Sequence, residues 1–135
     1  MTPAVFDANV LLHAMFGTGP HEAAREALQS HQPVAPDLLA IECANAVATL
    51  VRGGVLNAGD ASDVLHSMVS AVSLHVSMDH LPDALTLSLQ LEHPVYDCLY
   101  AALAEKLSLP IVTADKRFAK VFAGHPFTTI VDLNA

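Results

Sequence analysis

Two hydrophobic patterns alternate along the chain: short apolar runs, and longer stretches with an apolar residue every three or four positions. The short runs predict a buried strand at 3–6, further strands at 74–76, 110–113 and 128–131, and a brief extended piece at 33–36. The longer stretches predict helices, one beginning after Asp7 and the others at 21–29, 38–51, 60–72, 81–91, 94–107 and 116–122. Asp37 is expected to cap the 38–51 helix, and the pair Gly53-Gly54 to end it.

Strands that alternate with helices predict a mainly parallel central sheet with helices on both faces, a three-layer α/β/α fold. The chain has 135 residues and neither an internal repeat nor a linker, so we expect a single domain over residues 1–135. A hydrophobic fraction of 53% with 15% charged residues excludes intrinsic disorder. The 38–51 stretch is too short to span a bilayer and is expected to be a buried helix, so no membrane association is expected.

Charge and cysteine content narrow the classes of function. Fourteen acidic residues against six basic ones give a net charge of −8, which argues against a protein that coats nucleic acid but not against a nuclease. The N-terminus lacks a basic region and carries Asp7 inside its apolar part, so we expect no signal peptide and a cytoplasmic protein. Cys43 and Cys98 are predicted to be small core residues.

Four acidic residues occupy positions where side chains gather in a parallel α/β fold. Asp7 and Asp115 each follow a predicted strand, so a parallel sheet places both at one edge. Glu42 interrupts an apolar helix, where a charge is costly unless it faces water, a partner or a metal. Asp97 lies in the first turn of the 94–107 helix. Without a histidine or cysteine arranged as base and nucleophile, this set suits Mg²⁺ or Mn²⁺, which take oxygen ligands.

Each of these acids also has a structural explanation when it is taken alone. Asp7 or Asp115 could cap the helix that follows its strand. Glu42 could lie on a solvated stripe with Asn45, and Asp97 could stabilise the helix dipole. The pattern alone leaves these alternatives open.

Four segments together indicate a family. They are VFDANVLL around Asp7, APDLLAIECANAV around Glu42, YDCLYAALAEKLSLPIVTAD from Tyr96 to Asp115, and KRF from Lys116 onward. Nearly end to end, the chain resembles the PIN-domain ribonucleases, specifically the VapC toxins of bacterial toxin–antitoxin modules. The resemblance implies a PIN-like fold.

The resemblance also implies roles for the acidic residues, because the matching acids form a metal-binding pocket in that family. Asp7 and Asp97 are expected to be the first magnesium ligands, followed by Glu42. Asp115 is expected to complete the pocket or to bind a second ion.

Two polar residues are implied to support this pocket, Asn9 and Thr113. Thr113 and Asp115 are two positions apart on extended backbone, so their side chains point the same way. The Thr113 hydroxyl could therefore orient a water molecule or an Asp115 oxygen.

The implied activity is endonucleolytic hydrolysis of RNA by metal-activated water, leaving a 5′-phosphate and a 3′-hydroxyl. The implied cofactor is Mg²⁺, with Mn²⁺ as an alternative. The implied partners are RNA, a cognate VapB-type antitoxin and a second copy of the chain in a homodimer.

Other residues are candidates for binding RNA. Lys116, Arg117 and Lys120 form a local basic cluster that either contacts RNA phosphates or solvates a helix. The eight histidines show no paired ligand spacing and are predicted to be surface or core residues. Tyr96 and Phe118 are predicted to pack in the core rather than to stack on bases.

Two other functions compete with this interpretation. A haloacid-dehalogenase-type phosphatase also begins with a strand followed by an aspartate, but its motif needs a second aspartate where this chain has Asn9. A non-catalytic PIN-like module that only binds RNA or protein would be expected to have lost one or more of the four acids. This chain retains all four.

Overall fold

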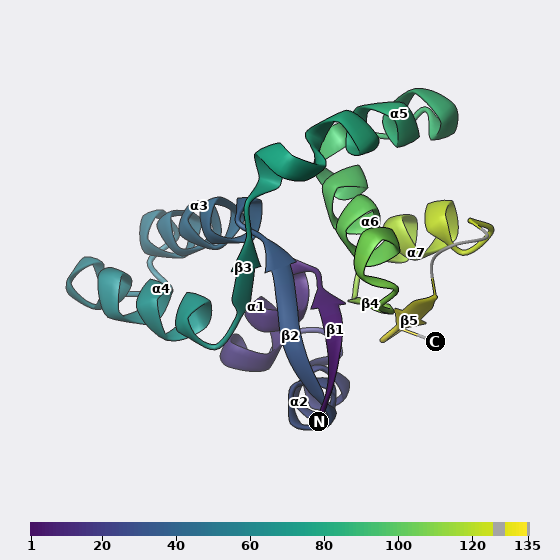
Figure 1. The fold of residues 1–135 in the computed structure, drawn as a ribbon. Helices are drawn as coiled ribbons and strands as arrows, with labels where there is room; N and C mark the ends of the chain where they lie inside the picture. Colours follow the sequence, from purple (N-terminus) through teal and green to yellow (C-terminus); the bar gives the residue numbers. More distant parts are fainter. Residues whose placement is uncertain (126–128, 135) are drawn as a thin grey trace.

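The computed structural model describes residues 1–125 and 129–134, and within them five parallel strands form the central sheet (Figure 1). The sheet order is β3-β2-β1-β4-β5. The strands are β1 (Thr2–Phe6), β2 (His31–Pro36), β3 (Ser73–His75), β4 (Ile111–Thr113) and β5 (Ile130–Asp132). The parallel sheet predicted from the alternation of strands and helices is therefore confirmed.

Helices connect the strands and complete a three-layer α/β/α arrangement. In Figure 1, α3 and α4 lie on the side of β3, whereas α6 and α7 lie on the side of β4 and β5. The helices are α1 (Ala8–Phe16), α2 (His21–Ser30), α3 (Leu38–Arg52), α4 (Ala61–Ser70), α5 (Leu81–Leu91), α6 (Val95–Leu107) and α7 (Lys116–Phe122), with short 3₁₀ turns η1 (Ala58–Asp60) and η2 (Ser77–His80). In the described part of the chain, no helix is both long enough and apolar enough to cross a membrane.

The two faces of the sheet contribute to two hydrophobic clusters, because successive strand residues point to opposite faces. On β1, Val5 belongs to the larger cluster, which includes most of the buried side of α6. Ala4 and Phe6 belong to the smaller cluster, which they form with residues of α1 and α2. Burial on both faces explains why β1 is a continuous apolar run.

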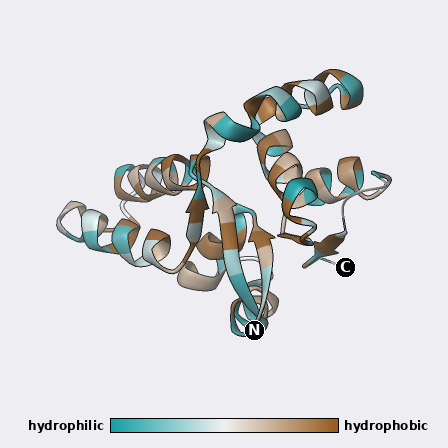
Figure 2. Ribbon diagram, viewed as in Figure 1, coloured by the Kyte–Doolittle hydropathy of each residue, from teal (hydrophilic) through white to brown (hydrophobic). Residues whose placement is uncertain are grey.

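The second strand is longer than the sequence pattern predicts. The apolar run at 33–36 indicated only a brief extended piece, but β2 begins at His31 and pairs with both β1 and β3. His31 and Gln32 pair with Thr2 and Pro3 at the exposed end of the sheet, where polar residues are tolerated. Figure 2 shows these N-terminal ends of β1 and β2 in hydrophilic colours. Hydropathy therefore misses this part of the strand.

The burial of α3 also differs from the prediction of a buried helix. Its buried residues follow one stripe, Leu39, Cys43 and Val47, whereas Ile41 is 68% exposed. The more deeply buried helix is α6, in which every residue from Cys98 to Ala104 is buried. Both cysteines are buried and free, as predicted.

The start of α3 corrects a predicted helix cap. The side chain of Asp37 does not cap α3; its Oδ1 accepts a hydrogen bond from the backbone amide of Ser77 at 3.1 Å. In exchange, the Ser77 hydroxyl accepts a hydrogen bond from the amide of Leu38, also at 3.1 Å. The cap is therefore provided by η2, a segment distant in sequence.

The remaining predicted elements agree with the structure to within a few residues. The helix predicted at 60–72 is α4, which the short turn η1 precedes, and α7 has the predicted bounds. The final strand was predicted at 128–131 and is found at Ile130–Asp132, while Thr128 lies outside the described residues.

Candidate functional site

A cavity of about 530 Å³ contains all four acidic residues that the sequence singled out. Asp7 comes from the end of β1, Glu42 from α3, Asp97 from the first turn of α6, and Asp115 from the loop after β4. The remaining lining residues are mostly apolar or amide side chains: Ala8, Asn9, Leu12, Leu38, Ile41, Asn45, Ala46 and Tyr96. Every charged residue that lines this cavity is therefore acidic.

Asp7 is the most buried of the four acids, with 7% of its surface exposed. Its Oδ2 accepts a hydrogen bond from the Thr113 hydroxyl at 3.0 Å, and its side chain does not cap α1. Burial raises the pKa of Asp7 to about 7, opposed by the Thr113 hydrogen bond and reinforced by the charges of Asp97, Glu42 and Asp115. The helix-cap explanation of Asp7 is therefore wrong.

The Thr113 hydroxyl links β4 to the loop that follows it. It donates to Asp7 and accepts a hydrogen bond from the backbone amide of Asp115 at 3.0 Å. It therefore orients Asp7, whereas the sequence suggested a water molecule or an Asp115 oxygen as its partner. Asn9 Oδ1 accepts a hydrogen bond from the amide of Ala114 at 3.3 Å, which ties the start of α1 to the same loop.

Asp115 has two functions in the local structure. Its Oδ1 caps α7 by accepting hydrogen bonds from the amides of Arg117 and Phe118 at 2.9 and 3.2 Å. It also lines the acidic cavity. The cap explanation proposed from the sequence is thus correct, and it is compatible with a place in the site.

Glu42 is held by a residue that the sequence analysis did not select. The buried Tyr100 hydroxyl donates a hydrogen bond to Glu42 Oε1 at 2.6 Å. Partial burial raises the pKa of Glu42, the Tyr100 hydrogen bond opposes that increase, and the charge of Asp97 adds to it. Glu42 is therefore not on a fully solvated stripe.

Asp97 is also held by an unselected residue, His93. Asp97 Oδ2 lies 2.6 Å from His93 Nε2, and the histidine is buried. The His93 ring packs edge-on against Phe122 at a centroid distance of 5.5 Å, and its backbone carbonyl accepts a hydrogen bond from Ser88 at 2.6 Å. Phe122 thus packs against the imidazole that contacts Asp97, and Ser88 holds the backbone of the same residue.

The sequence contained a signal for each of these two partners. His93 precedes Asp97 by four residues, a spacing that brings side chains together around a helix start. Tyr100 stands in an otherwise apolar buried run, and a buried phenol normally requires a hydrogen-bond partner. Its partner lies 58 residues away, so the sequence did not identify it.

The donor set of the cavity is suited to a hard divalent cation. One oxygen of each carboxylate is engaged by the protein, and the other has no hydrogen-bond partner among the described residues. Partners of this kind orient metal ligands in proteins. Among residues 1–125 and 129–134, no three histidine, cysteine or acidic side chains are grouped closely enough to form a ready metal site. The oxygen chemistry fits Mg²⁺ or Mn²⁺, and the arrangement is open.

The residues considered for RNA contact lie in different environments. Lys116, Arg117 and Lys120 are exposed on α7, outside the cavity wall. Phe118 is buried as predicted, but Tyr96 is 61% exposed and lines the cavity, so its prediction as a core residue is wrong.

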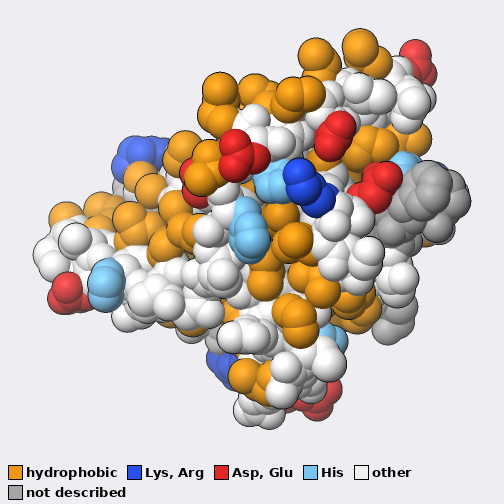
Figure 3. Space-filling view, viewed as in Figure 1, with side chains coloured by type: hydrophobic (Ala, Val, Ile, Leu, Met, Phe, Trp, Pro, Cys, Tyr) orange, Lys and Arg blue, Asp and Glu red, His pale blue; other side chains and the backbone are white. Residues whose placement is uncertain are grey.

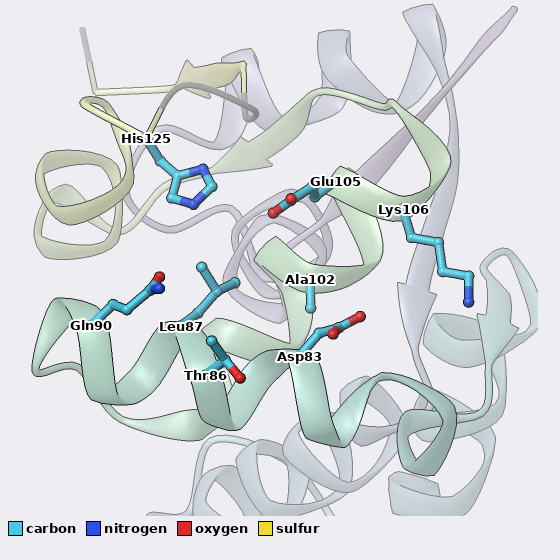
Figure 4. Close-up of a pocket in the computed structure, with 8 residues that line it drawn as sticks. All are labelled: Asp83, Thr86, Leu87, Gln90, Ala102, Glu105, Lys106 and His125. Carbon is cyan, nitrogen blue, oxygen red and sulfur yellow. The ribbon is translucent and has the colours of Figure 1, made fainter.

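A second cavity, of about 610 Å³, lies beside α5 and α6 (Figure 4). Its lining includes charges of both signs, with Asp83 and Glu105 accompanied by Lys106. It contains none of the four acids.

Comparison with known proteins agrees with this geometry. The family model of the PIN domain matches residues 4–123, a range that includes the four acids. Ribonuclease VapC3 of Pyrobaculum aerophilum is 34% identical over 104 residues, which cover 75% of this chain and 79% of the relative. Ribonuclease VapC1 of Mycobacterium tuberculosis is 30% identical over 122 residues, which cover 88% of this chain and 90% of the relative.

Solved structures show the same fold. A protein of Pyrobaculum aerophilum matches with a TM-score of 0.73 and 20% identity, covering 98% of this chain and 92% of that one. A DNA-bound VapBC from Salmonella typhimurium matches with a TM-score of 0.71 and 17% identity, covering 98% and 99%. A toxin–antitoxin complex from Klebsiella pneumoniae gives a TM-score of 0.69 at 18% identity, covering 96% and 97%.

Metal-free protein should lose stability as the pH rises from about 4 to 7. Folded Asp7, with a pKa of about 7, retains a proton that the unfolded chain releases near 3.8. Fewer protons are then bound in the unfolded state, so the free energy of unfolding falls with pH by an amount on the order of 2 to 4 kcal/mol. Asp7→Asn should flatten this dependence and stabilise the fold at pH 8.

Urea unfolding in the presence of a chelator at pH 4 to 9 measures this effect. Asp63→Asn, which removes an exposed acid on α4, is the control and should reproduce the wild-type pH profile. Parallel profiles for wild type and Asp7→Asn would contradict the assigned pKa of Asp7.

Proposed function

The chain belongs to the PIN-domain family and is related to the VapC ribonucleases, and on this basis we propose that it is a divalent-metal-dependent endoribonuclease, the toxin of a toxin–antitoxin module. The observation that carries the proposal is the cavity lined by Asp7, Glu42, Asp97 and Asp115. A non-catalytic module has no need to keep four carboxylates in one cavity.

Asp7 and Asp97 are the first metal ligands in this proposal. Their support is the pair of fixed oxygens, one bound by Thr113 and the other by His93, which leaves the second oxygen of each carboxylate available. Glu42 is the next ligand, and Asp115 completes the pocket or binds a second ion. Asn9 supports the site through the loop after β4.

The proposed reaction is hydrolysis of an RNA phosphodiester with a 5′-phosphate and a 3′-hydroxyl as products. A bound Mg²⁺ or Mn²⁺ would lower the pKa of the attacking water and neutralise charge that develops on the phosphate. No lysine or arginine among the described residues lines this cavity, so the bound cation would supply the positive charge there. We propose that the protein acts in the cytoplasm, where RNA is present.

RNA binding in this proposal relies on the basic residues of α7. The helix begins directly after Asp115, so Lys116, Arg117 and Lys120 are held near the cavity edge and are exposed. An enzyme with a net charge of −8 needs local positive charge to hold a polyanion. These three residues are therefore the proposed phosphate contacts.

The proposed protein partners are a VapB-type antitoxin and a second copy of the chain. The uniformly acidic cavity favours an antitoxin segment that carries a basic side chain. A second copy is favoured by an exposed apolar stripe on α5, formed by Leu81, Leu85 and Leu89 at successive turns. Figure 3 shows hydrophobic side chains along this upper edge, over η2 and α5. Apolar surfaces of this kind are typical of homodimer interfaces.

Ribonuclease activity should vanish in chelator and return with Mg²⁺ or Mn²⁺. Asp7→Asn and Asp97→Asn should each reduce the cleavage rate of single-stranded RNA by more than about 100-fold, because each removes a ligand charge. Circular dichroism should show that both variants remain folded. Asp83→Asn in the second cavity is the matched control and should retain activity. Metal-independent cleavage by the pure protein would overturn the proposal.

The affinity for single-stranded RNA should depend only weakly on salt. Two or three phosphate contacts predict a slope of log affinity against log salt of roughly −1.5 to −2, from about −0.7 for each contact. Replacing Lys116 and Lys120 with alanine should reduce the slope by about one for all RNA sequences alike. The binding assay uses Ca²⁺ or the Asp7→Asn variant to prevent cleavage, with Lys106→Ala as the control. An unchanged slope would assign the α7 cluster to solvation only.

Light scattering after size exclusion should give twice the 14.2 kDa monomer mass. Leu85→Lys combined with Leu89→Lys should produce monomers, because it places charges in the apolar stripe, whereas Val55→Lys outside the stripe should not.

A small basic protein encoded upstream should co-purify on co-expression. A wild-type monomer at micromolar concentration that captures no such protein would contradict both proposed partners.

A further inference from the structure

The Tyr100 hydroxyl provides the only hydrogen bond between α3 and α6 among the described residues. Tyr100 is 1% exposed and belongs to the buried run from Cys98 to Ala104, where its hydroxyl is the only side-chain oxygen or nitrogen. The hydroxyl donates a hydrogen bond to Glu42 Oε1 at 2.6 Å. A single polar contact thus connects the two helices that carry Glu42 and Asp97.

We propose that Tyr100 is a positioning residue that holds Glu42 in the orientation needed to bind the divalent metal. This inference rests on the proposed metal-dependent function. Tyr100 is not one of the four acids and was not selected from the sequence.

The physical argument begins with the freedom of the glutamate side chain. Glu42 is on a helix with only one buried stripe, and Ile41 beside it is largely exposed. A glutamate there has several rotamers available, some of which point to bulk solvent. Tyr100 contributes a rigid ring that is fixed in the core, so its hydroxyl selects one of them. The bond occupies Oε1 and leaves Oε2 without a hydrogen-bond partner among the described residues, on a side chain that lines the acidic cavity.

The bond also differs from simple satisfaction of a buried phenol. A phenol in a purely structural role can bond to any acceptor, including a backbone carbonyl of a neighbouring helix. Here the acceptor is one of the four carboxylates of the acidic cavity. Outer hydrogen-bond partners that orient a ligand typically change metal affinity by about 10- to 100-fold when they are removed.

Tyr100→Phe tests the inference through metal affinity rather than activity. The variant keeps the buried ring and removes only the hydroxyl. Calorimetric titration with Mg²⁺ and with Mn²⁺ should show binding about 10- to 100-fold weaker than wild type. Thr49→Val removes an exposed hydroxyl from α3 that bonds within that helix and lies outside the cavity lining, so it is the control, with wild-type metal affinity expected.

A double-mutant cycle separates positioning from a general effect on folding. In the Glu42→Gln background, the additional change Tyr100→Phe should alter metal affinity less than twofold, because the charged ligand that it positions is absent. If the two changes weaken binding independently, the hydroxyl acts on the fold and not on Glu42, and the inference fails.

Tyrosine fluorescence provides a measurement that keeps Tyr100 in place. The protein has two tyrosines and no tryptophan, so the Tyr96→Phe variant emits from Tyr100 alone. Mg²⁺ binding should change this emission, because the metal draws charge from the carboxylate that accepts the phenol hydrogen bond. The same titration in Tyr96→Phe with Glu42→Gln should give no change.

The outcomes distinguish this inference from the proposed function. If wild type binds neither Mg²⁺ nor Mn²⁺, the metal-dependent function itself is overturned. If wild type binds metal, and Tyr100→Phe binds it equally well, only the positioning role is overturned. If Tyr100→Phe does not fold, the fluorescence titration decides, and unchanged emission at saturating Mg²⁺ overturns the positioning role.

Discussion

Parallel pairing of β1 with β4 is the constraint on which the acidic cavity depends. It brings the amide of Asp7 to the carbonyl of Val112 at 3.0 Å, so the two strands end side by side. The Thr113 hydroxyl then joins the two strand ends, one through a carboxylate and the other through the Asp115 amide. Helices α3 and α6 approach this same edge and add the remaining acids. The position of the site is therefore set first by the order and direction of the strands, and the side chains then complete it.

Crowding of like charges is the second consequence of this topology. Asp7 is almost fully buried and is influenced by three other carboxylates, an environment that opposes its ionised form. Proteins retain unfavourable local electrostatics of this kind mainly at functional sites, where a cation or substrate compensates it. The hydrogen bonds to Thr113, Tyr100, His93 and the start of α7 limit the cost, because they supply each carboxylate with at least one donor.

The sequence predicted the part of the site that follows from periodicity. Strand–helix alternation was enough to place Asp7 and Asp115 at one edge, because that placement needs only a parallel sheet. It did not predict the hydrogen bond between Tyr100 and Glu42. These residues are 58 positions apart, and their contact depends on how α3 packs near α6 in the fold. The prediction that α3 is a buried helix was wrong for the same reason. Hydropathy shows that α3 is rich in apolar residues, but it does not show which of them are covered by neighbouring elements.

The sequence separation between Asp7 and Thr113 determines how much of the chain must be made before the site can form. The Asp7 carboxylate and its Thr113 partner are 106 positions apart, so most of the chain must be synthesised before they can meet. During translation, β1 and α3 leave the ribosome without β4, and the acids they carry have no common cavity. A nascent chain therefore lacks the complete acidic cavity until α6 and β4 have both been synthesised.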